Sequence, residues 1–276
     1  MKNIIIPVDF SKYSEFALKT ASKLAKKHKT KLILVHMLEM PTGYSDHDSN
    51  YGKTLVFLIK YAEKKMEAFL KKEYLEGVTI KVIIKHFTLF QEVGNLAAEQ
   101  DASLIVMGSH GISEHNDTFL GSNTEKVVRS SPIPVLIVKE EVESVDFEKS
   151  VFVSDFKMES IEAYKKAQMF YKTLGIKPTL LFINKPDGGF VSTNEMKARF
   201  ENFLMKADGN LDNLSNFDNY DDYTVAAGVK YYANENNISL ISVATHGKSS
   251  LSKFFNKSIS LDIANKSTRP VLTVLI

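Results

Sequence analysis

The 276-residue sequence contains no cysteine and no tryptophan. The lack of cysteine excludes disulfide bonds, thiol catalysis and cysteine-ligated metal, and it fits a reducing compartment such as the cytoplasm. No run of about 18 apolar residues occurs, so the sequence predicts neither a membrane span nor a signal peptide. The net charge is only +2. Nucleic-acid-binding domains usually carry a clustered basic face, so we expect neither nucleic acid nor an anionic membrane as a partner.

Several motifs of catalysis and phosphate binding are also missing. The sequence has no Gly-x-x-x-x-Gly-Lys loop, no Gly-x-Gly-x-x-Gly fingerprint and no Gly-x-Ser-x-Gly elbow. Its histidines are scattered without the spacing of metal ligands, and His36 lies in an apolar segment where a core histidine is expected. We therefore expect no catalytic residues, no metal ligated by the protein and no enzyme activity.

The sequence does contain a regular alternation of apolar strands and amphipathic helices. Helices between successive strands predict an α/β fold with parallel sheets covered on both faces. Ser11 is placed to cap the first helix, and segment 214–223 is a poor strand because it is rich in Asn and Asp. The expected strands are 3–8, 31–38, 78–86, 102–108, 134–138, 150–154, 178–184, 214–223, 238–244 and 271–276. The expected helices are 11–28, 53–75, 92–100, 122–130, 159–174, 194–206, 225–234 and 258–265.

The second half of the sequence repeats the first. The segment Ile241–Gly247 mirrors Ile105–Gly111, and Val151–Phe156 mirrors Ile5–Phe10. A repeat of about 140 residues has the size of a domain rather than of a solenoid unit. We therefore predict two copies of one fold, with a first domain at 1–140, a charged linker at 141–149 and a second domain at 150–276.

The first copy carries a glycine pattern directly after an apolar strand. Gly108-Ser109-His110-Gly111 is followed, after nine residues, by Gly121-Ser122. Glycines let backbone N–H groups approach phosphate oxygens, and the start of a helix near Ser122 adds further N–H groups. The hydroxyls of Ser122 and Thr124 are candidates to complete such a site. The alternative is that these glycines only turn the chain.

The pattern is damaged in the second copy. Ala244 and Lys257 stand where Gly108 and Gly121 stood. Alanine adds a Cβ, and lysine disfavours a positive φ if the first copy needs one there. Lysines 248, 253 and 257 supply charge or form a solvated basic face. We therefore expect a ligand in the first copy, with the second as a structural partner.

Two residues outside the glycines are also candidates. Asp9 ends the first strand and Gly108 ends the fourth, and ligands of such sheets bind beyond the strand C-termini at the switch point. Asp9 alternatively satisfies the start of the first helix. His110 has a counterpart, His246, in the damaged copy, so we expect it to make a structural hydrogen bond rather than to act in catalysis.

These residues together resemble a tandem universal stress protein. The segments that carry the resemblance are Pro7–Ser11, Val35–Met37, Met107–Gly111, Phe119–Val128 and Pro132–Val138. The resemblance implies two flavodoxin-like domains related by a pseudo-twofold axis, each with a five-stranded parallel sheet of order 3-2-1-4-5. It also implies that the two fifth strands pair, which makes an internal pseudo-dimer, and that two such chains can associate as a homodimer.

The glycine spacing matches the ATP-binding branch of that family. The resemblance implies a stress-response regulator that binds ATP, with Mg²⁺ carried by the nucleotide, and passes a conformational change to an unidentified protein partner. The implied nucleotide-binding residues are Pro7, Val8, Asp9, Met37, Gly108, His110, Gly111, Gly121, Ser122, Asn123 and Thr124. One departure is that Glu114 and Asp117, partly offset by His115, place negative charge in the nine-residue excursion. The alternative is a scaffold protein whose nucleotide sites are vestigial.

Overall fold

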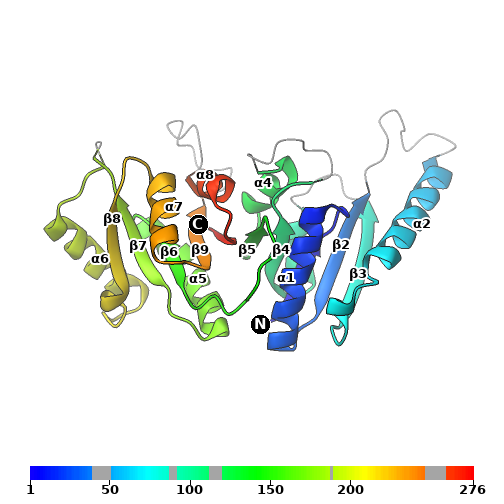
Figure 1. Ribbon diagram of the computed structural model, residues 1–276, viewed down its shortest axis with the longest axis horizontal. Helices are drawn as coiled ribbons and strands as arrows, with labels where there is room; N and C mark the ends of the chain where they lie inside the picture. Colours follow the sequence, from blue (N-terminus) through cyan, green and yellow to red (C-terminus); the bar gives the residue numbers. More distant parts are fainter. Residues whose placement is uncertain (39–50, 87–91, 112–119, 187–188, 246–258) are drawn as a thin grey trace.

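The computed structural model describes residues 1–38, 51–86, 92–111, 120–186, 189–245 and 259–276. Ten strands form one sheet that runs across the width of the molecule (Figure 1). The strands are β1 Asn3–Pro7, β2 Leu32–Leu38, β3 Ile80–His86, β4 Ala102–Gly108, β5 Val135–Val138, β6 Ser150–Val153, β7 Thr179–Asn184, β8 Phe217–Asp221, β9 Leu240–Thr245 and β10 Val271–Leu275.

Eight α-helices lie in the described part of the chain. They are α1 Lys12–His28, α2 Tyr51–Phe69, α3 Glu92–Glu99, α4 Ser122–Val128, α5 Ile161–Leu174, α6 Thr193–Ala207, α7 Val225–Glu235 and α8 Ile259–Lys266. Short 3₁₀ turns lie at Glu73–Leu75, Met158–Ser160 and Leu214–Asn216. None of these helices combines the length and the apolar character needed to cross a membrane.

The strand order confirms the predicted fold class. The sheet reads β3-β2-β1-β4-β5-β10-β9-β6-β7-β8, so each half has the order 3-2-1-4-5. Neighbouring strands within a half are parallel, whereas β5 and β10 pair antiparallel, with Leu136 opposite Leu272. The expectation that the two fifth strands pair within one chain is therefore confirmed.

Both faces of the sheet are buried because side chains of a strand alternate between its faces. Ile4 and Ile6 belong to one hydrophobic cluster and Ile5 to the other. Helices α1, α2, α5 and α6 cover the first cluster, and α3, α4, α7 and α8 cover the second. Each cluster contains residues from both halves of the sheet, so the two halves share their cores across the β5–β10 pair.

Several element boundaries differ from the sequence-based expectation, most clearly in three elements. The second helix ends at Phe69 rather than at residue 75, because Lys72 is extended (φ −135°, ψ 128°) and a 3₁₀ turn follows. That turn still buries Leu75 in the core, so the apolar pattern continued past the end of the helix. Helix α5 begins at Ile161, after a 3₁₀ turn, and the poor strand is limited to Phe217–Asp221.

The charged segment between the halves is not a free tether. Its apolar side chains Val145 and Phe147 are buried. Three lysines spaced four residues apart on α1 bind its polar groups. Lys19 pairs with Glu141 at 2.9 Å, and Lys27 pairs with Asp146 at 2.7 Å. Between them, Lys23 donates to the carbonyl oxygens of Val142 and Glu143 at 2.6 and 2.9 Å. The segment is thus packed along α1, the helix that begins at the candidate site.

Candidate functional site

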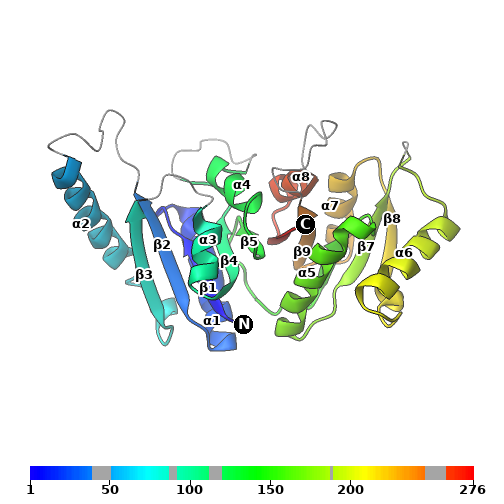
Figure 2. The same ribbon diagram turned by 180° about the vertical axis from the view of Figure 1, so that it is seen from behind.

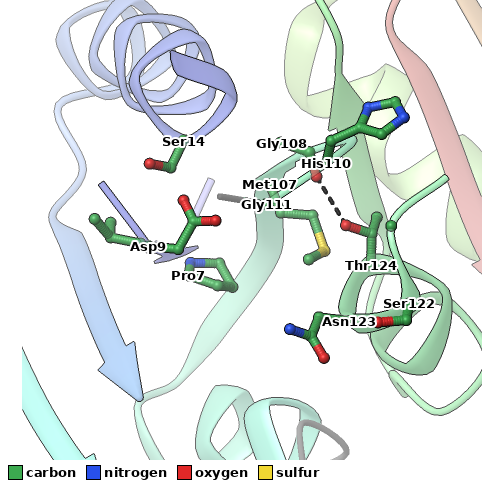
Figure 3. Close-up of a pocket in the computed structure, with 12 residues that line it drawn as sticks. Pro7, Asp9, Ser14, Met107, Gly108, His110, Gly111, Ser122, Asn123 and Thr124 are labelled. Carbon is green, nitrogen blue, oxygen red and sulfur yellow. Dashed lines mark hydrogen bonds between the residues drawn. The ribbon is translucent and has the colours of Figure 1, made fainter. Parts of the chain in front are cut away.

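A cavity lies where strands β1 and β4 end. These strands are neighbours, and the strand order reverses between them, which is the switch point at which open α/β sheets bind ligands. Figure 3 shows the side chains around this cavity. The lining residues are Pro7, Val8, Asp9, Ser14, Met107, Gly108, His110, Gly111, Gly121, Ser122, Asn123 and Thr124.

The turn from β1 into α1 places Asp9 in the cavity. Its Oδ1 accepts a hydrogen bond from the Ser11 N–H at 3.0 Å. The Ser11 hydroxyl in turn accepts from the Ser14 N–H at 3.2 Å, which confirms Ser11 as the N-cap of α1. A Cβ added to Gly111 would lie 2.9 Å from Asp9 Oδ2. The carboxylate therefore supports the entry to α1 and, at the same time, lies against the glycine loop.

Gly108 is required by packing within the protein. A Cβ at this position would lie 2.7 Å from the carbonyl carbon and from the Cβ of Tyr13, in the first turn of α1. Contacts this short do not occur, so any side chain at 108 forces strand and helix apart. In the second half, where Ala244 replaces this glycine, α5 begins only after the 3₁₀ turn at Met158–Ser160. The glycine allows close packing of α1, whether or not a ligand also approaches it.

The return of the chain into α4 is anchored to the end of β4. The Gly121 N–H donates to the Ser109 carbonyl oxygen at 2.7 Å, and the Thr124 hydroxyl donates to the Gly108 carbonyl oxygen at 2.9 Å (Figure 3). Gly121 has φ −58° and ψ 143°, so no positive φ is needed there. The proton of the Thr124 hydroxyl is thus donated within the fold, which leaves the lone pairs of its oxygen as the part that can contact a ligand.

The charge around the cavity is sparse. Among the described lining residues Asp9 is the one acid, and no lysine or arginine is present. Lys126, one turn further along α4, has its Nζ 3.4 Å from Asn123 Oδ1, which places a cation at the rim. In the part of the chain that the structure describes, no three His, Asp or Glu side chains come together as a metal site would need.

The two histidines near the cavity have structural hydrogen bonds. His110 is buried, and its Nδ1 lies 2.7 Å from the Ser109 hydroxyl oxygen, which confirms the expected bond at the base of the loop. Its ring lies 5.0 Å from that of Tyr13, and its Nε2 has no hydrogen-bond partner among the described residues. His36 Nδ1 lies 2.7 Å from the Val8 carbonyl oxygen, as expected of a core histidine.

The cavity collects ten of the eleven residues expected to bind a nucleotide. Met37 is the exception: it lies on β2, packed against the second hydrophobic cluster, and does not line the cavity. Sequence reasoning missed Ser14 and Met107. Met107 directly precedes Gly108 in the motif, and Ser14 follows the N-cap of α1, so both positions carried a signal.

Several residues named from the sequence lie outside the described residues. They are Glu114, His115 and Asp117 of the excursion, and His246, Lys248, Lys253 and Lys257 of the second copy.

Comparison with known proteins decides the family. The profile of the universal stress protein family matches residues 1–139, just over half of the chain. The chain belongs to the universal stress protein family. Similar proteins include a universal stress protein of Methanocaldococcus jannaschii, 29% identical over 153 residues (50% of this chain and 94% of that protein). Another, from Synechocystis, is 28% identical over 137 residues (50% of this chain and 85% of that protein).

One solved structure extends the likeness to both halves. A universal stress protein from Archaeoglobus fulgidus has a TM-score of 0.73 and 21% identity, and the match covers 99% of this chain and 98% of that one. Identity at this level shows the fold alone. The universal stress protein fold therefore extends over the whole described chain, including the half that the family profile does not match.

Proposed function

We propose that this universal stress protein is a stress-response regulator that binds one adenine nucleotide, ATP with Mg²⁺, in the cavity between β1 and β4. Binding changes the conformation of the loop at 109–124 and thereby the contacts with a protein partner, with little or no turnover. The division into a first domain at 1–140, a connector at 141–149 and a second domain at 150–276 belongs to the same proposal. We also propose that two such chains associate as a homodimer.

The observation that carries the proposal is the convergence of the glycine motif on the switch point of the sheet. Residues from three separate stretches of the chain, 7–14, 107–111 and 121–124, line one cavity. Beyond the ends of parallel strands, backbone N–H groups are exposed that a phosphate can accept from. Membership of the universal stress protein family supports the same assignment.

The described residues fit the nucleotide in named roles. Helix α4 begins at Ser122, and the backbone N–H groups of a helix's first turn point out of its N-terminal end, where a phosphate can accept from them. These groups and the Asn123 amide are placed for the terminal phosphates. Gly108 and Gly111 border the ribose and the α-phosphate, and Asp9 with Pro7 and Val8 borders the base. Mg²⁺ carried by the nucleotide would neutralise phosphate charge, since the described lining has no lysine or arginine.

A second candidate function is a scaffold that binds no nucleotide. Three observations favour it: Gly108 is needed for packing against Tyr13, the Thr124 hydroxyl is used within the fold, and the described lining has no lysine or arginine. All three are explained without a ligand. The two candidates differ in one measurable property, which is the affinity for ATP.

Isothermal titration of ATP with Mg²⁺ into the purified chain distinguishes them. We expect one site per chain with submillimolar affinity. The test variant is Gly121→Lys, which copies the residue of the second half. The backbone at Gly121 suits any L-residue, so this variant is expected to fold and to lose binding.

The matched control is Gly52→Lys. Gly52 lies in α2, where an added Cβ meets nothing within 4 Å, so the same charge is added in open space. It is expected to bind ATP like the wild type. Absence of heat in the wild type supports the scaffold instead, and equal binding by Gly121→Lys shows that the phosphate site is assigned wrongly.

A further inference from the structure

The end of the glycine loop is held by a residue of the second half. Helix α8 lies next to α4 in both views of the molecule (Figure 1, Figure 2). Asn265, in the last turn of α8, accepts a hydrogen bond on its side-chain oxygen from the N–H of Leu120. Leu120 directly precedes Gly121, so this contact joins the far half of the chain to the point where the candidate site begins.

Asn265 is itself held by the first half. The ammonium of Lys139, which directly follows β5, donates to the Asn265 carbonyl oxygen at 2.5 Å. Lys139 is half-buried, and burial lowers the pKa of its ammonium group. Because a buried cation is costly without a partner, this contact ties the end of α8 to the end of β5. The backbone of Asn265 is thereby held next to the first half, and its side-chain oxygen reaches the Leu120 N–H.

The Leu120 contact is one of three that set the position of the loop end. Gly121 N–H and the Thr124 hydroxyl are bound to carbonyl oxygens at the end of β4, both within the first half. The Leu120 N–H is the one of the three whose acceptor comes from the second half. The backbone from Leu120 to Asn123 is therefore positioned by both halves.

The residue that corresponds to Asn265 in the first copy behaves differently. Arg129, 136 positions earlier in the sequence, donates from its Nε to Glu125 within α4 at 2.8 Å. Its guanidinium thus forms an ion pair inside its own helix, one turn apart. The asparagine, with a short side chain and an acceptor oxygen, is suited to reach a backbone N–H of the other half.

We infer that Asn265 is a positioning residue, through which the second half of the chain holds the segment 120–124 at the start of α4 in the conformation that binds phosphate. This inference rests on the proposed function. It gives the damaged copy a role: it need not bind a nucleotide itself, because it sets the affinity of the other copy. Coupling of this kind is reciprocal, so a nucleotide bound in the first half also tightens α8 against that half.

The contact is tested first without any nucleotide. Amide hydrogen exchange on the whole chain is expected to show slow exchange at Leu120 in the wild type and faster exchange in Asn265→Ala. Asn265→Asp keeps an acceptor oxygen and is expected to restore protection. Lys266→Ala is the matched control, because Lys266 is exposed on the same helix turn and pairs with Asp262 within α8. Unchanged exchange at Leu120 in Asn265→Ala overturns the inference.

The functional part is tested by titrating ATP with Mg²⁺ into the same proteins. Asn265→Ala is expected to weaken binding by a factor on the order of ten, and Lys266→Ala to leave it unchanged. ATP is also expected to slow amide exchange in α8 of the wild type. A wild type that binds ATP together with an Asn265→Ala variant that binds equally well overturns the inference alone. A wild type that binds no adenine nucleotide overturns the proposed function and, with it, this inference.

Discussion

Gly108 and Tyr13 approach so closely that a side chain cannot be placed between them: an added Cβ would lie 2.7 Å from the Tyr13 carbonyl carbon. We predict that Gly108→Ala lowers the free energy of unfolding by about 1–3 kcal/mol, because strand and helix must shift to admit the methyl group. Urea unfolding followed by circular dichroism measures this. Gly52→Ala is the control, since it adds the same methyl group in open space. A stability of Gly108→Ala equal to the wild type would show that α1 can move freely at this point.

The hydroxyl of Thr124 provides the second prediction. Thr124→Val keeps the shape of the side chain but leaves the buried Gly108 carbonyl oxygen without its donor, which costs about 1–3 kcal/mol of unfolding free energy. Thr124→Ser keeps the donor and loses one methyl group, at a cost of about 0.8 kcal/mol. Thermal or urea unfolding compares the two. If Thr124→Ser is the less stable variant, the hydroxyl does not anchor α4.

Lys126 at the rim of the cavity leads to a prediction about ligand charge. Its ammonium is exposed and lies 3.4 Å from Asn123 Oδ1, so we expect Lys126→Met to weaken ATP binding about three- to tenfold, equivalent to about 0.6–1.4 kcal/mol. Binding of AMP, which lacks the terminal phosphates, is expected to change less. Titration calorimetry with both nucleotides measures the difference. Lys266→Met, on the second half, is the control, and an equal loss for ATP and AMP would contradict placement of the terminal phosphates near Lys126.

The ion pairs between the connector (141–149) and α1 make the free energy of unfolding depend on pH. Hydrogen bonds from Lys19 and Lys27 hold the pKa values of Glu141 and Asp146 below their ordinary range. A depressed carboxyl pKa contributes stability that is present above the ordinary carboxyl pKa of about 4 and is lost as the pH falls further. We therefore predict that the double variant Lys19→Met, Lys27→Met loses less stability than the wild type when the pH is lowered below about 4.

Unfolding midpoints measured as a function of pH test this. Both carboxylates are exposed, so the contribution of the ion pairs is expected to be small and to fall further in high salt. Burial lowers the pKa of His28, and the charge of Lys27 lowers it further. The single variant Lys19→Met leaves Lys27 in place, so it is the comparison in which the His28 contribution cancels. Parallel pH profiles of the two proteins below about pH 4 would show that the lysines do not hold the connector.

The architecture was predictable because its signals are local. Apolar strands, helix periodicity and the repeated segments are properties of neighbouring residues, and Ser11 capping α1 is visible three residues from its partner Ser14. The segment after Phe69 shows that such local signals do not determine where a helix ends. A 3₁₀ turn there buries Leu75 much as a continued helix would.

Several features that sequence reasoning missed depend on distant partners. Gly108 is required by Tyr13 rather than by a turn conformation, and Leu120 meets Asn265 across 145 positions of the sequence. The acids of the connector look like a solvated linker in the sequence, yet Glu141 and Asp146 pair with Lys19 and Lys27, which lie about two helical turns apart on α1. No local pattern in the sequence reveals which of its polar groups find such partners.

The most direct test of the account is a nuclear magnetic resonance titration of the ¹⁵N-labelled 276-residue chain with ATP and Mg²⁺. The account predicts that the amide shifts of Gly108, Gly111 and Gly121 change together and saturate at one nucleotide per chain. The amide of Ala244, at the equivalent point of the second half, is expected to remain unchanged. Shifts centred on Ala244, or no shifts at saturating ATP, would contradict the assignment of the nucleotide site to the cavity between β1 and β4.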